Sequence, residues 1–174
     1  MTATPSPNEI VREFYKAFEE PIHEGAPSVA PEIISDERLE LKIALIVEEV
    51  SELLDATYSD SVGSLFRNAW KHAVNTGMTK NPKRDFVEMF DAAIDIDVVV
   101  NGLAIETNMP VAAGHKEVLR GNLSKLGADG KPLRSDGVTP ASDGEVKPKN
   151  KIIKGPNYVA PDLLTVLREH GYEG

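Results

Sequence analysis

Two long segments combine helical periodicity with acidic charge, and they restrict the fold more than any other feature of the sequence. Residues 36–58 and residues 83–107 each carry apolar side chains at the spacing of an α-helix. Residues 44–56 read ALIVEEVSELLDA, in which four acidic residues stand among apolar ones and no basic residue balances them. Each segment is long enough to cross a small domain, so we predict an all-α helical bundle built around two long helices.

Shorter segments repeat the helical pattern. Asn8 is a predicted N-cap for a helix that ends near Glu20, and Ser35 is the predicted N-cap of the first long helix. Pro82 stands where the second long helix is expected to begin. Further helices are predicted at about residues 61–74, 110–126 and 161–172.

The composition changes after residue 125. Residues 126–161 contain five glycines and five prolines, which predicts loops and a small hairpin in place of helix. This segment is basic, because residues 120–154 hold eight Lys or Arg against four Asp or Glu. We therefore expect a flexible tail (residues 1–8), a helical bundle (9–125) and a loop-rich C-terminal extension with a short final helix (126–174).

Overall composition excludes several classes of protein. The net charge of −9 over 174 residues argues against a surface that binds nucleic acid polymers. No apolar run is long enough for a membrane span, and the first residues lack the pattern of a signal peptide, so we expect a cytoplasmic protein. The absence of cysteine excludes thiolate metal sites.

The acidic residues gather on one side of each long helix. At roughly 100° per residue, the acids of the first helix fall opposite its main apolar stripe. On the second helix Glu88, Asp91 and Asp95 fall within about 60° of one another, whereas Asp97 points elsewhere. Neighbouring carboxylates repel one another outside bulk water and need cations. The residues alone leave three interpretations open: a pair of solvated acidic faces, pairing with cations from elsewhere in the chain, or a site for a hard divalent ion such as Mg²⁺ or Mn²⁺.

The sequence resembles a known family at these acids. EEVSE on the first long helix and DAAID on the second are similar to the EExxE…(E/D)xxD pattern of the all-α nucleotide pyrophosphohydrolases, the MazG-like superfamily. Downstream, GNLSKLGADGKPLRSDG and IIKGPNYVAPDL resemble the C-terminal part of its phosphoribosyl-ATP pyrophosphohydrolase-like branch. The resemblance covers about residues 36–163. It implies a helical bundle that forms a homodimer or homotetramer and hydrolyses a nucleoside triphosphate with Mg²⁺.

The resemblance also implies roles for individual residues. Glu48 matches the acid that orients or deprotonates the attacking water. The implied metal ligands are Glu49, Glu52, Asp91 and Asp95. The family's motif has an acid three residues before the final Asp, where this chain has Ala92. We prefer Asp91 as its substitute; pairing Glu88 with Asp91 is the shifted alternative.

Phosphate-binding residues are expected from the basic part of the chain. Asn122 and Lys125 match positions that contact phosphates in the family, and Lys154 and Tyr158 lie in the KGPNY stretch. Arg67 and Lys71, on the predicted helix at 61–74, are weaker candidates. Core packing is favoured over base stacking for Trp70, and surface or capping roles for the scattered histidines (23, 72, 115 and 170). No GxxxxGK[ST] loop is present.

These observations predict hydrolysis of a nucleoside triphosphate to the monophosphate and pyrophosphate, with dUTP and non-standard nucleotides among the candidate substrates. Two alternatives stay open. One is hydrolysis of phosphoribosyl-ATP in histidine biosynthesis, against which the long C-terminal extension counts. The other is a non-catalytic helical protein that binds a nucleotide or metal, which the departure at Ala92 keeps open.

Overall fold

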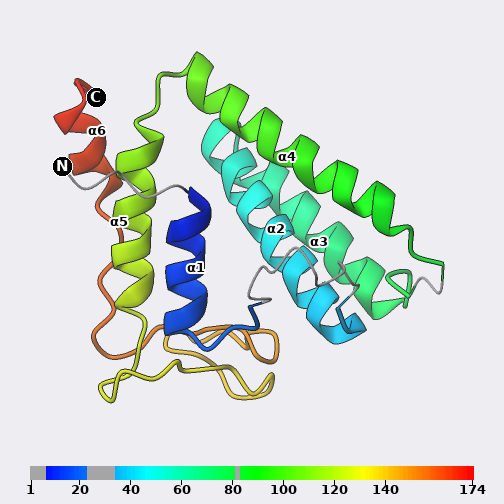
Figure 1. Ribbon diagram of the computed structural model, residues 1–174. Helices are drawn as coiled ribbons and strands as arrows, with labels where there is room; N and C mark the ends of the chain where they lie inside the picture. Colours follow the sequence, from blue (N-terminus) through cyan, green and yellow to red (C-terminus); the bar gives the residue numbers. More distant parts are fainter. Residues whose placement is uncertain (1–6, 23–33, 81–82) are drawn as a thin grey trace, which may run out of the picture. The chain divides into compact units, whose positions relative to one another are not determined.

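The computed structural model describes residues 7–22, 34–80 and 83–174, and the regular elements of that part of the chain are all helices (Figure 1). They are α1 (Pro7–Ala17), α2 (Asp36–Thr57), α3 (Asp60–Asn75), α4 (Phe86–Glu106), α5 (Val111–Leu123) and α6 (Leu163–Glu169). The predicted all-α fold is confirmed, and both long segments are helices. His23, Pro82 and most of the N-terminal tail lie outside the described residues.

The chain forms two compact units. One is residues 30–92, which hold α2, α3 and the start of α4; the other is residues 1–29 with 93–174, which hold the rest. The domain boundaries expected from composition, at residues 8 and 125, stay a prediction. No helix in the described ranges is long and apolar enough to cross a membrane.

In the first unit α2 packs against α3. Ser35 caps α2 as predicted, since its side chain accepts a hydrogen bond from the Arg38 N–H. Gly63 on α3 is buried, and a Cβ there would overlap the carbonyl oxygen of Ser51 on α2. At this point the two helices are so close that only a residue without a side chain fits.

In the second unit α5 packs against both α1 and α6. Phe18, just after α1, is fully buried. The α1 helix ends at Ala17, before the predicted Glu20, because Glu19 adopts a left-handed backbone with φ of 52°. The N–H of Glu20 then donates to the carbonyl of Tyr15 at 2.9 Å, as in a Schellman C-cap.

Two helix starts differ from the sequence-based expectation. The α1 helix begins at Pro7, and proline is common at the first position of a helix. Asn8 therefore lies inside the helix, where its side chain accepts a hydrogen bond from Arg12 Nε and does not cap the helix. The α4 helix begins at Phe86, because Asp85 Oδ1 accepts from the N–H groups of residues 87 and 88.

The segment between α5 and α6 is loop with short antiparallel pairing. Residues 133–135 lie beside residues 150–153, where Arg134 bridges to Ile152, and a second bridge joins Pro140 to Val146. The predicted small hairpin is thus present as isolated bridges. This paired segment runs beneath the ends of α1 and α5 in Figure 1.

Candidate functional site

The three predicted acids of the first motif lie in the middle of α2. Glu48 is half-buried, whereas Glu49 and Glu52 are exposed. Because Glu48 and Glu52 are one turn apart, their side chains project from the same face of the helix. This face of α2 therefore presents carboxylate oxygens to solvent.

Asp55, the fourth acid of this stretch, is paired within the chain. Its Oδ2 accepts from Arg67 Nη1 at 2.8 Å, and its Oδ1 accepts from the Gly63 N–H at 2.8 Å. A cation from elsewhere in the chain thus balances this acid, because α3 folds back and brings Arg67 to α2. Arg67, a predicted phosphate-binding residue, is bonded to a carboxylate here.

The second acidic group lies on α4. Asp91, Asp95 and Glu88 are all exposed. Asp91 and Asp95 are about 6 Å apart along the axis of one continuous helix, so they share a face. Ala92, at the departure from the family motif, adds no ligand.

The described residues contain no group of three or more acidic or histidine side chains that could hold a metal ion. Glu49 and Glu52 lie on a different helix from Asp91 and Asp95. The metal-ligand assignment accordingly stays a prediction.

The predicted phosphate-binding residues come together at the C-terminal end of α5. Lys125 Nζ donates to Asn122 Oδ1 at 2.6 Å. The Lys154 Nζ lies 4.7 Å from the centroid of the Tyr158 ring. The two pairs meet through the backbone, since the Gly155 N–H donates to the Lys125 carbonyl at 3.0 Å. Four candidates separated by up to 36 positions thus form one local cluster, here called the α5 cation cluster.

Residues 155–161 run along α5 and are fixed there by several contacts. Ser124 Oγ accepts from the Val159 N–H at 2.9 Å. Arg120 Nη2 donates to the Ala160 carbonyl at 2.8 Å. A Cβ at Gly121 would come within 2.6 Å of the Pro161 ring, so the chain passes directly over this glycine. The position of the KGPNY stretch follows from these contacts.

Glu117 anchors the next part of the chain. Its carboxylate accepts from the Arg120 guanidinium and from the Asp162 N–H, the latter at 2.6 Å. The hydrogen bond from Arg120 is the main reason that the pKa of Glu117 is lowered from 4.5 to about 2. The sequence alone did not indicate this junction, although Glu117 and Arg120 stand at the i, i+3 spacing of helix neighbours.

The remaining candidates are separate from these groups. Lys71 is exposed and Trp70 is half-buried on α3. Among the histidines, His72 is exposed, and His170 follows α6 with its Nδ1 2.8 Å from the Val166 carbonyl. His115 on α5 is half-buried, and its Nδ1 is buried without a hydrogen-bond partner.

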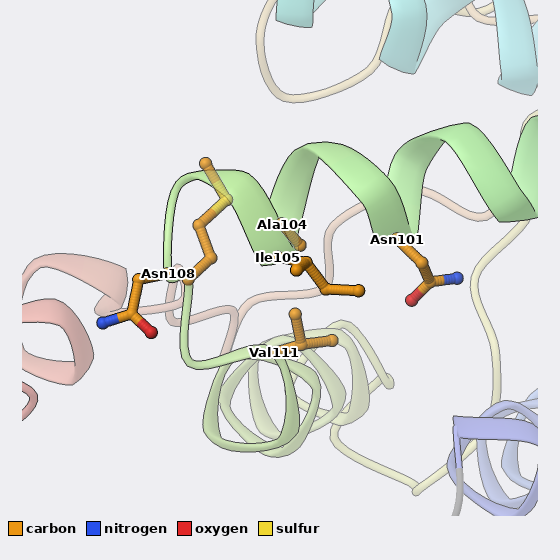
Figure 2. A pocket seen from close by; sticks show the side chains of 6 residues that line it. Asn101, Ala104, Ile105, Asn108 and Val111 are labelled. Carbon is orange, nitrogen blue, oxygen red and sulfur yellow. The ribbon is translucent and has the colours of Figure 1, made fainter.

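A pocket of about 420 Å³ lies where α4 turns into α5 (Figure 2). It is lined by Asn101, Ala104, Ile105, Asn108, Met109 and Val111. Figure 2 shows the side chains of Ile105 and Val111 pointing toward each other across it. At roughly 100° per residue, Ala104 and Asp95 fall on opposite sides of α4, so the pocket does not include Asp95.

Comparison with known proteins decides the family. The family model for phosphoribosyl-ATP pyrophosphohydrolase matches residues 11–122, more than half of the chain. The chain belongs to this family. The matched region contains all the acids of both motifs, and the predicted resemblance is confirmed. The prediction of an enzyme, a nucleotide pyrophosphohydrolase, is also confirmed.

A solved structure shares the fold. It is described as "a putative NTP pyrophosphohydrolase" from Exiguobacterium sp. 255-15, with 20% sequence identity and a TM-score of 0.59. The similarity covers 97% of this chain and 98% of that one. It therefore includes the loop-rich segment beyond residue 122, where the family model ends. No curated protein matches the chain.

Proposed function

We propose that this pyrophosphohydrolase acts on a nucleoside triphosphate and releases the monophosphate and pyrophosphate. The α5 cation cluster is the observation that carries the proposal. It contains Lys125, which donates to the Asn122 side chain, and Lys154, whose ammonium group lies over the Tyr158 ring. Ammonium groups at such a site are suited to the charge of a polyphosphate chain. Lys125 and the KGPNY stretch lie beyond the matched family region, but within the part shared with the Exiguobacterium protein.

Mg²⁺ is the proposed cofactor, with Mn²⁺ as a substitute. Carboxylate oxygens are the ligands that both hard cations prefer, and Glu49, Glu52, Asp91 and Asp95 would supply them. The bound ion would neutralise charge on the phosphates. Glu48, half-buried beside this face of α2, would orient the attacking water and accept its proton.

Phosphoribosyl-ATP is the second candidate substrate, because the matching family model bears its name. It carries a triphosphate as well, so the α5 cation cluster suits both molecules. The non-catalytic alternative is not retained, because the chain belongs to a family of enzymes and both acidic motifs fall inside the matched residues.

We also propose that the enzyme is a homodimer or homotetramer with α4 in the interface. Apolar side chains are exposed along the whole helix, among them Val87, Phe90, Val98, Val99 and Ile105, which are 60–79% exposed. The helix is about 31 Å long, and exposed apolar side chains that continue over such a length are typical of a surface that binds another protein. All of its charged residues are acidic.

Pyrophosphate release tests the proposed reaction. Standard and non-standard nucleoside triphosphates and phosphoribosyl-ATP are supplied with Mg²⁺, with Mn²⁺ and with EDTA. We expect metal-dependent release of pyrophosphate and monophosphate from a triphosphate. Turnover of phosphoribosyl-ATP alone would favour the second candidate, and a folded protein without turnover of any of these compounds would contradict the proposed reaction.

A further inference from the structure

Arg134 joins three separate segments of the second unit. Its Nη1 donates to Glu20 Oε1 at 2.8 Å and to the Asn150 carbonyl at 3.2 Å, and its Nη2 donates to the Phe18 carbonyl at 2.6 Å. The Glu20 side chain is only 5% exposed, so this carboxylate depends on a cation inside the protein. Arg134 thereby fixes the paired loop segments to the end of α1.

The backbone carries this restraint toward Lys154. The Ser135 N–H donates to the Lys151 carbonyl at 2.9 Å, and the Ile153 N–H donates to the Leu133 carbonyl at 3.0 Å. Backbone hydrogen bonds at Leu133 and Ser135, the two neighbours of Arg134, therefore join residues 133–135 to residues 150–153. Lys154 follows directly after the last bonded residue of that pairing.

Lys154 is also held from its other side. The Gly155 N–H donates to the Lys125 carbonyl at 3.0 Å, at the end of α5. The backbone of Lys154 thus lies between two hydrogen-bonded neighbours: Ile153, bonded to Leu133 beside Arg134, and Gly155, bonded to Lys125. The side chain of Lys154 itself is exposed, so the backbone determines where its ammonium group is presented.

We propose that Arg134 is a positioning residue, which holds Lys154 beside Lys125 so that both bind the phosphates of the substrate. This inference rests on the proposed function of the α5 cation cluster. Arg134 acts here through the loop pairing. Its guanidinium donates to Glu20 and to two carbonyl oxygens, and the several donors of a planar guanidinium can bond all three acceptors at once.

Binding of inorganic pyrophosphate, measured by calorimetry with Mg²⁺ and with EDTA, tests the proposal without requiring turnover. We expect Lys154→Gln to weaken binding about tenfold, since it removes one charge-assisted contact. Arg134→Gln should weaken binding about threefold or more, and Arg134→Lys less, because lysine retains the charge beside Glu20. Arg12→Gln, on the exposed face of α1, is the matched control and should leave the affinity unchanged.

A double variant separates positioning from a general loss of structure. If Arg134 acts through Lys154, Arg134→Gln should change pyrophosphate affinity by less than about twofold in the Lys154→Gln background. An equal loss in both backgrounds would overturn the proposal, as would unchanged affinity in folded Arg134→Gln or in Lys154→Gln. Where Arg134→Gln does not fold, Arg134→Lys provides the same comparison.

Turnover measurements distinguish this inference from the proposed function. A positioning role predicts a higher KM with kcat nearly unchanged in the Arg134 variants. Failure of the wild-type enzyme to hydrolyse any triphosphate would contradict the proposed reaction, while the pattern of pyrophosphate affinities would still decide the role of Arg134. Absence of pyrophosphate binding by the wild type would overturn the positioning role itself.

Discussion

The N–H of Gly63 donates a hydrogen bond of 2.8 Å to Asp55 Oδ1, which places α3 directly against α2. A Cβ at this glycine would overlap the Ser51 carbonyl oxygen and the Asp55 carboxylate. Gly63→Ala should therefore destabilise the protein by about 3 kcal/mol or more, at the upper end of the range for overpacking. Denaturant unfolding measures this. Gly102→Ala, where a Cβ meets no atom within 4 Å, should not destabilise it, and an equal loss in both variants would contradict this account.

Glu49→Gln and Glu52→Gln test the predicted metal ligands on α2. Each change removes a negative charge from an exposed side chain, so the fold should survive while Mg²⁺-dependent turnover falls at least about a hundredfold. Kinetics at several Mg²⁺ concentrations, with circular dichroism as the check on folding, provide the measurement. Glu37→Gln, in the exposed first turn of the same helix, should retain activity. Wild-type turnover in either site variant would refute the metal assignment.

Gly155→Ala tests the approach of the KGPNY stretch to α5. A Cβ there would lie 2.6 Å from the Leu126 carbonyl oxygen and 2.7 Å from that of Lys125. The segment must move, so we expect weaker substrate binding together with a loss of about 1–3 kcal/mol of stability. The measurements are KM and thermal unfolding. Gly114→Ala on α5 meets no neighbouring atom and should be neutral or stabilising; normal KM in Gly155→Ala would argue against the α5 cation cluster.

Glu117 predicts a specific dependence of stability on pH. Its pKa is lowered from 4.5 to about 2 in the folded state, chiefly by the hydrogen bond from Arg120, so its stabilising contribution is fully present above about pH 4.5. That contribution is lost as the pH falls toward 2. The difference in unfolding free energy between wild type and Glu117→Gln should therefore shrink over this interval. A difference that does not vary with pH would contradict the ionic role of Glu117.

Val98→Lys tests the proposed interface on α4. Val98 is 60% exposed near the middle of the helix, and a charge there would have to be desolvated on association. We expect light scattering after gel filtration to give the mass of a dimer or tetramer for wild type and a smaller mass for the variant. Val138→Lys, at a loop residue that is 77% exposed, is the control. An unchanged mass in Val98→Lys would exclude this part of α4 from the interface.

The helical spacing of apolar residues predicted the helices, including α4, whose apolar side chains are exposed. Ser35 was identifiable as a cap from its residue type and position. The ends were harder to predict. Asp85 caps α4 three residues after Pro82, and Glu19 adopts the left-handed conformation that usually indicates glycine. Neither residue differs in type from acids elsewhere in the chain, so sequence alone did not mark them.

Residues of the candidate site were predictable from the sequence only where they share one helix or one sequence motif. The resemblance to the family located Asn122, Lys125 and the KGPNY stretch, and the fold brings them together. The pairing of Asp55 with Arg67 depends on how α3 folds back on α2, and the contact of Arg134 with Glu20 joins residues 114 positions apart. Such contacts have no local sequence signal, because they are consequences of tertiary packing.

The partners of α1 have a consequence for synthesis of the chain. The α2–α3 pair joins neighbouring segments, so it needs to close only a short loop and can form early on the ribosome. By contrast, α1 is made before α2 and α3 but packs on α5, and Glu20 meets Arg134 only after more than a hundred further residues have been added. The end of α1, including the Glu20 carboxylate, therefore stays exposed to solvent while the central helices are translated. A chaperone can bind the segment during that time.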